Sequence, residues 1–279
     1  MNGFMGMWGK FWGLFGLLLL SLTACRAPVS APSVLPTPPT TAVLHLGITT
    51  SSTTFAGLVT EPFQAERPLI HLEFTPANDA ALFAKLQDGT LDAALLHVIP
   101  PENEFWFNPV ALDGLAIVVH LESNVAELTV EQVQGVFNGR LANWQTVGGQ
   151  NQPITLVSRE SGAGARTLLQ QQVLATQPLH INTLIQTSQA MLVETVANDP
   201  NSIGYGMMGA MPNTVKMVAI NGRLPTPNEV GTQNYPLTTP LYFVTNSPNE
   251  PQDELRTLLA WLQSPAGQAI ISQRYGRVR

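Results

Sequence analysis

The chain has 279 residues, of which 44% are hydrophobic and only 11% are charged. Two of its 13 basic residues, Lys10 and Arg26, precede residue 42, whereas no acidic residue precedes Glu61. The body from residue 42 onward therefore carries 11 basic and 19 acidic side chains, a net charge of −8. A nucleic-acid-binding protein needs a basic surface, so this balance argues against that class. The single cysteine excludes an intrachain disulfide and a cysteine-based metal cluster.

Residues 1–25 are predicted to be a targeting segment. Lys10 supplies a positive charge, and residues 11–22 are apolar apart from glycine and Ser21. This run is too short to span a membrane comfortably but has the length of a signal-peptide core. It ends in Leu22-Thr23-Ala24-Cys25, which resembles the lipobox of bacterial lipoproteins and implies lipidation of Cys25. An ordinary signal peptide with an incidental cysteine is the alternative.

Residues 26–41 are predicted to be a tether between the membrane and the folded body. Five of these 16 residues are proline, and most of the others are Ser, Thr or Ala. Such a composition cannot build a core and favours an extended chain. We therefore exclude this stretch from the fold.

The first third of the body alternates strands with helices. Strands are expected at 43–48, 69–74, 91–96 and 112–120, and helices at 55–63 and 79–86. Residues 49–54 form a hydroxyl-rich turn after the first strand, Thr49-Thr50-Ser51-Ser52-Thr53-Thr54. This alternation is typical of a parallel α/β sheet.

The rest of the body continues with both kinds of element. Thr129 and Gln132 fit a capping box for a helix over 130–137. Further helices are expected at 166–174, at 251–263 and after Ser264-Pro265, with strands at 153–157, 203–205, 215–220 and 237–245. The segment 158–166, SRESGAGAR, joins a strand to a helix.

A series of segments in the middle and C-terminal parts keeps the order and spacing of a known family. They are 112–119, 128–137 with Gly139, 143–144, 147–149, 153–154, 157–160, 203–205, 235–237, 240–242, 264–265 and 267–268. Through these segments the chain resembles the phosphate-binding lipoproteins of bacterial phosphate ABC transporters. Residues 49–52, 57–58 and 91–97 are instead similar to the tungstate-binding proteins of related transporters. Both resemblances imply the same fold, while the ligand stays open between phosphate and tungstate or molybdate.

The implied fold is the α/β type II periplasmic-binding-protein fold, in which two lobes are joined by two crossing strands. Residues 42–115 and 240–279 would form lobe 1, and 116–239 would form lobe 2. Ligand would bind in the cleft between the lobes and stabilise their closure, which a permease then recognises.

The segment 158–166 is the strongest candidate for an oxyanion site. Glycines at 162 and 164 open a turn, so the backbone N–H groups of Gly162, Ala163, Gly164 and Ala165 can converge on one anion. Arg159 can add a bidentate fork, and a helix is expected to turn Arg166 away. A plain glycine-rich loop that caps a helix is the alternative.

The chain departs from the phosphate receptors at two places. They carry Ser-Gly-Thr where this chain has Ala163-Gly164-Ala165, so two hydroxyl donors are missing. Hydroxyls of the run that starts with Thr49, Thr50, Ser51 and Ser52 are candidates to replace them, and the turn 75–79 is a weaker one.

The second departure is His97, which stands where the family places a carboxylate that accepts the proton of hydrogen phosphate. A neutral imidazole can accept that proton, whereas an imidazolium only donates. A histidine buried at a strand end is the alternative. The five histidines show no metal-binding spacing, and no nucleotide-binding or nucleophile motif is present.

The sequence thus predicts a solute-binding receptor of an ABC importer for phosphate or a related tetrahedral oxyanion. We expect a monomer that is not an enzyme, with no metal, no cofactor and no nucleic-acid partner. Its partners would be the ABC permease complex and, through the lipid anchor, the outer face of the cytoplasmic membrane. The alternatives are a tungstate or molybdate receptor, and a surface sensor or interaction protein that has lost tight binding.

Overall fold

The structure, a computed structural model, describes residues 41–101 and 104–278. The expected signal segment with Cys25, and the tether up to residue 40, lie outside the described residues. Among those described, no helix combines the length and the apolar character that a membrane span requires.

The first part of the body alternates strand and helix, as predicted. Strand β1 (Ala42–Thr49) pairs in parallel with both β2 (Ile70–Ala77) and β3 (Ala93–Leu96). Helices α1 (Thr53–Glu66) and α2 (Asp79–Gln87) connect them. In such a parallel arrangement the carboxyl ends of the strands meet at one edge of the sheet, where Thr49, the turn before α2 and His97 all lie.

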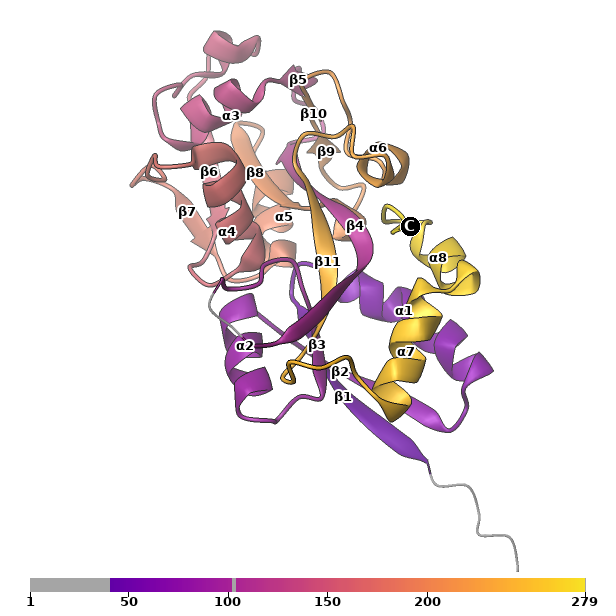
Figure 1. Cartoon of the computed structure of the whole chain (residues 1–279). Helices are drawn as coiled ribbons and strands as arrows, with labels where there is room; N and C mark the ends of the chain where they lie inside the picture. Colours follow the sequence, from indigo (N-terminus) through magenta and orange to yellow (C-terminus); the bar gives the residue numbers. More distant parts are fainter. Residues whose placement is uncertain (1–40, 102–103, 279) are drawn as a thin grey trace, which may run out of the picture. The chain divides into compact units, whose positions relative to one another are not determined.

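Two long strands run antiparallel to each other, β4 (Trp106–Val119) and β11 (Thr238–Thr245) (Figure 1). The first half of β4 pairs with β11, and its second half pairs with β8. β11 also pairs with β3, so these two strands link the two ends of one mixed sheet. The sequence predicted β4 only from residue 112, because Asn108 and Pro109 interrupt its apolar pattern.

The segment between β4 and β11 supplies the other end of this sheet, in the order β4-β8-β6-β7. Its main elements are α3 (Val130–Phe137), β6 (Thr155–Arg159), α4 (Gly164–Leu169), β7 (Leu184–Gln186), α5 (Gln189–Asn198) and β8 (Ser202–Met207). Its shorter elements are β5 (Glu127–Leu128), η1 (Trp144–Val147), η2 (Gln170–Leu174), η3 (Met208–Ala210), β9 (Lys216–Met217), β10 (Ala219–Ile220) and α6 (Pro227–Gly231).

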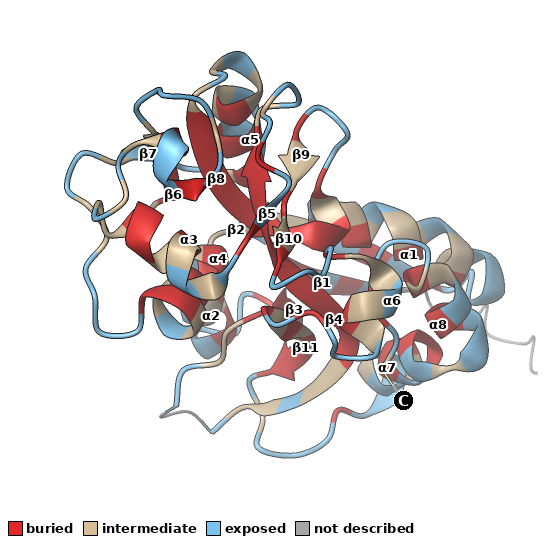
Figure 2. Ribbon diagram, turned by 90° about the horizontal axis from the view of Figure 1, so that it is seen from above, coloured by how far each residue is buried: buried red, intermediate tan, exposed pale blue. Residues whose placement is uncertain are grey.

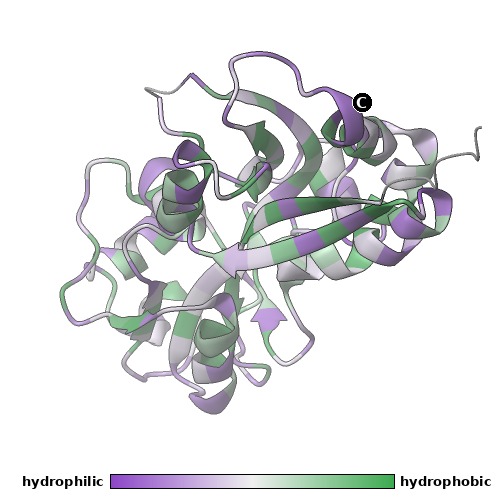
Figure 3. Cartoon of the chain, turned by 90° about the horizontal axis from the view of Figure 1, so that it is seen from below, coloured by the Kyte–Doolittle hydropathy of each residue, from purple (hydrophilic) through white to green (hydrophobic). Residues whose placement is uncertain are grey.

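Local capping explains why several helices begin where they do. The predicted capping box of α3 is present, with the Gln132 backbone N–H donating to Thr129 and the Thr129 N–H donating to the Gln132 side chain. Helix α7 (Asp253–Gln263) is followed by α8 (Pro265–Ile271). Ser264 caps the N-terminus of α8, and Pro265 occupies the first position of that helix. Figure 3 shows both hydrophilic and hydrophobic stretches on the helices, as expected of helices with one buried face.

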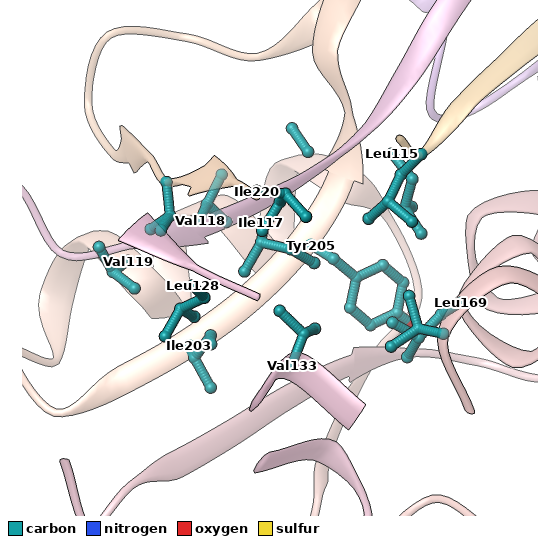
Figure 4. Close-up of a cluster of buried hydrophobic side chains, with 14 of the residues drawn as sticks. Leu115, Ile117, Val118, Val119, Leu128, Val133, Leu169, Ile203, Tyr205 and Ile220 are labelled. Carbon is teal, nitrogen blue, oxygen red and sulfur yellow. The ribbon is translucent and has the colours of Figure 1, made fainter. Parts of the chain in front are cut away.

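The buried side chains divide at the crossing strands. One cluster draws on residues between Leu112 and Leu237, and its centre around Tyr205 and Val133 is shown in Figure 4. A second combines residues 44–111 with residues 241–275. The buried strands of both groups run through the middle of the molecule (Figure 2). This division supports the lobe boundaries near residues 115 and 240, which we keep as a proposal. The group that combines residues 44–111 with 241–275 is called lobe 1, and the group between Leu112 and Leu237 is called lobe 2.

Candidate functional site

Arg159 lies at the end of β6 and joins residues from both lobes. Its side chain is almost fully buried. The Nη1 group donates to the Ser51 hydroxyl at 3.0 Å, and Nη2 donates to the Thr50 hydroxyl at 3.0 Å. Thr50 and Ser51 follow β1 of lobe 1, whereas Arg159 belongs to lobe 2. The structure therefore brings together three residues that the sequence analysis chose from segments 108 positions apart.

The charge of Arg159 is matched by the next residue in the chain. Glu160 accepts from Nε of Arg159 at 2.9 Å and from Nη2 at 3.0 Å. Such a bidentate pair is strong and geometrically specific. Nη2 also donates to the Thr187 carbonyl at 3.4 Å. Each of the three guanidinium nitrogens therefore already has an acceptor, and an incoming anion competes with these acceptors.

Tyr205 of β8 holds the backbone of Arg159 in place. Its hydroxyl accepts from the Arg159 backbone N–H at 3.1 Å and lies 2.6 Å from the Ser158 hydroxyl. Burial raises the pKa of Tyr205, so its phenol stays neutral at physiological pH. Hydrogen bonds thus hold both the side chain and the backbone of Arg159 in place.

The loop after β6 makes its own contacts with lobe 1. Gly162 has a φ of +91°, a conformation that favours glycine, and its carbonyl accepts from the Ala80 N–H at 3.1 Å. The Gly164 N–H donates to Oδ1 of Asp79 at 2.9 Å. Ala163 and Ala165 are buried, and their methyl groups provide no hydrogen bond.

Asp79, the first residue of α2, places a carboxyl group directly against this loop. Its Oδ1 also accepts from the Thr49 hydroxyl at 2.8 Å, while Oδ2 is buried without a hydrogen-bond partner. Burial raises the pKa of Asp79, although His97, the hydrogen bonds from Thr49 and Gly164, and Arg159 oppose the shift. In its neutral form this acid can use Oδ2–H as a hydrogen-bond donor.

His97 belongs to a separate buried network beside the crossing strand β4. Its Nε2 lies 3.3 Å from Oδ2 of Asp113 and 3.5 Å from the Ser52 hydroxyl, and its Nδ1 is buried without a partner. Asp113 in turn accepts from the backbone N–H groups of Gly114 and Gly209. The ligand role of His97 stays a prediction.

The structure also bears on Arg166, on residues without a predicted role and on metal binding. The predicted turn of Arg166 away from the site stays a prediction; its Nη1 is buried and has no hydrogen-bond partner. The sequence analysis gave no role to Glu160, Asp113 or Tyr205 and only a weak one to the turn that contains Asp79. Of these residues, only Glu160 could have been predicted from the sequence, because it directly follows Arg159. Within residues 41–101 and 104–278, no group of three or more His, Cys, Asp or Glu side chains could hold a metal ion.

The chain is similar to several known binding proteins. It is 26% identical over 254 residues to the phosphate-binding protein PstS of Pseudomonas aeruginosa, covering 79% of each chain. With the phosphate-binding protein PstS of Borreliella burgdorferi it shares 24% identity over 175 residues, which span 59% of this chain and 62% of the relative.

Solved structures show the same fold. A putative phosphate ABC transporter substrate-binding protein with bound phosphate from Clostridium perfringens superimposes with a TM-score of 0.79 at 24% identity. The match covers 85% of this chain and 100% of that one. An ABC-type phosphate transport receptor from Vibrio cholerae gives 0.69 at 23% identity, covering 84% and 100%.

The PBP superfamily domain matches residues 35–266, most of the chain. The crossing strands, the mixed sheet and this match agree with one another. The chain belongs to the PBP superfamily and has the type II periplasmic-binding-protein fold.

Proposed function

We propose that this protein is the solute-binding receptor of an ABC importer and that it captures phosphate or a related tetrahedral oxyanion between its lobes. One observation carries the proposal. The buried guanidinium of Arg159 in lobe 2 is aimed at the hydroxyls of Thr50 and Ser51 in lobe 1. Buried arginine with converging hydroxyl and backbone donors is the donor set that replaces the hydration shell of an oxyanion.

The relatives support binding without a chemical reaction. The relatives are named as phosphate-binding proteins, and a similar solved protein contains phosphate. An anion that takes the place of the Thr50 and Ser51 hydroxyls on Arg159 could also accept from Oδ2–H of a neutral Asp79. The Gly164 N–H could join only if the anion displaced the Asp79 oxygen to which it now donates. These contacts come from both lobes, so the anion favours closure, and the closed form is what an ABC permease would recognise.

A lipid anchor at Cys25 completes the proposal. It would hold the receptor on the outer face of the cytoplasmic membrane, where a solute can pass from receptor to permease. The segment ending in Leu22-Thr23-Ala24-Cys25 supports it.

A surface sensor that has lost tight anion binding is the second candidate. Its support is that Glu160 and Asp79 already place carboxylate groups on the donors Arg159 and Gly164. Two hydroxyls of the related receptors are also replaced by Ala163 and Ala165.

Calorimetric titration with phosphate, sulfate, molybdate and tungstate tests the proposal. We expect phosphate to bind, and Arg159→Ala to weaken binding by about 2–5 kcal/mol, roughly 30-fold to several thousand-fold. Arg256→Ala, which removes a half-exposed arginine from α7, is the control and should bind like the wild type. If no oxyanion binds, the sensor is favoured; if Arg159→Ala binds as well as the wild type, the site is misplaced.

A further inference from the structure

A cavity borders the Arg159 site. It has a volume of about 500 Å³ and is lined from lobe 1 by Thr50, Thr53 and Thr54, and from α5 of lobe 2 by Val193, Glu194 and Ala197, among others. Thr50 is also an acceptor of Arg159 Nη2. Thr50 therefore both lines this cavity and contacts the Arg159 guanidinium, which we propose binds the anion.

The volume of the cavity exceeds what an inorganic oxyanion needs. The four oxygens of phosphate fill about as much space as four water molecules, roughly 120 Å³ at about 30 Å³ each. Sites for organic ligands typically measure about 300–1,000 Å³. The cavity thus has room for a substituent of several atoms on the anion.

The residues that line the cavity determine which charge the substituent can carry. Glu194 is the one ionisable residue among the lining residues, none of which is basic. Thr53, Thr54, Asn198 and Thr214 offer hydroxyl and amide groups. A second anionic group is disfavoured here, whereas a polar neutral group or an ammonium group is matched by hydrogen bonds and by the carboxylate of Glu194.

We infer that the ligand of this protein is a phosphate monoester or phosphonate with a short, polar or cationic substituent. Its phosphoryl group binds at Arg159, and its substituent occupies the cavity between α5 and the start of α1. The inference rests on the proposed function, because it uses the same anion site. Since the cavity is lined from both lobes, the substituent adds contacts that favour closure.

Calorimetry on the full-length protein in detergent tests this with inorganic phosphate, ethyl phosphate and phosphoethanolamine. We expect phosphoethanolamine to bind at least tenfold more tightly than inorganic phosphate. Ala190→Trp places an indole in the cavity from an exposed position of α5. It should weaken phosphoethanolamine at least tenfold and leave inorganic phosphate unchanged. Ala269→Trp, at an exposed position of α8, is the matched control and should alter neither.

Glu194→Gln tests the charge of the substituent. It should lower the preference for phosphoethanolamine over ethyl phosphate several-fold. Inorganic phosphate that binds as tightly as both esters overturns the inference but leaves the proposed function standing. Tight ester binding that Ala190→Trp does not weaken also overturns it. Failure of all three solutes to bind also overturns the inference, and the proposed function falls with it only if sulfate, molybdate and tungstate fail to bind as well.

Discussion

At the scale of single residues, we expect the carboxyl group of Asp79 to make anion binding depend on pH. Burial raises its pKa, and its Oδ2 has no hydrogen-bond partner. In the neutral form, Oδ2–H can donate to an anion, whereas the ionised form repels it. A bound dianion favours the protonated acid and so raises this pKa further.

Sulfate is the appropriate probe of this dependence, because it carries no proton near neutral pH. We expect sulfate affinity to be highest at pH values below the raised pKa of Asp79 and to fall, by at most about tenfold per pH unit, as the pH rises through it. Titrations of sulfate between pH 4 and pH 8 measure this.

Asp79→Asn provides the matched comparison. The amide keeps an oxygen for Thr49 and the Gly164 N–H and keeps a donor at the Oδ2 position, but it cannot ionise. Its sulfate affinity should be nearly constant with pH. An equal pH dependence in both proteins would assign the effect to another group.

At the scale of elements, the close approach of α2 to the loop before α4 depends on a missing side chain. A Cβ on Gly164 would lie 2.4 Å from Oδ2 of Asp79. Asp79 is buried, and its other oxygen accepts from the Thr49 hydroxyl, so a shift of its carboxyl group would disturb this hydrogen bond. We therefore expect a side chain at residue 164 either to push the two elements apart or to break that bond.

We therefore expect Gly164→Ala to lower the free energy of unfolding by about 1–3 kcal/mol, the usual cost of overpacking a buried contact. Gly57→Ala is the control, because Gly57 lies in α1 and a Cβ there meets no atom within 4 Å. That change should stabilise the protein by about 0.5–1 kcal/mol. Urea unfolding followed by circular dichroism measures both, and equal effects would show that the Asp79 contact is not tight.

At the scale of the whole molecule, the expected lipid on Cys25 would decide where the receptor works. Cys25 lies outside the described residues, so this prediction rests on the sequence alone. The anchoring of a receptor to a membrane needs no contact with the folded body, only a tether long enough to let the lobes close.

Cys25→Ser should move the protein from the membrane fraction to the soluble fraction, because a single processed N-terminus carries all of the lipid. Fractionation of cells that express either form measures this, with Ser21→Ala as a control that leaves the cysteine in place. A Cys25→Ser protein that stays in the membrane fraction contradicts the lipoprotein prediction.

The sequence by itself determined most of the elements, because their signals are local. The alternation of strand and helix before residue 97, the capping box at Thr129 and the Ser264-Pro265 helix start are present in the structure. The sequence missed the first half of β4 and did not anticipate β7, α5 and α6, whose apolar patterns are short or interrupted. The choice of Arg159 and the hydroxyl run as candidates also came from the sequence, since both follow strands.

Only the tertiary structure decided which of these candidates meet. Thr50 and Ser51 reach Arg159, Thr49 reaches Asp79, and Ser52 lies beside His97, although all four hydroxyls are neighbours in the chain. Successive residues in a turn point in different directions, so their order does not fix their partners. The pKa of Asp79 also depends on residues that are far apart in sequence, because desolvation is set by everything packed around a group and not by its neighbours in the chain.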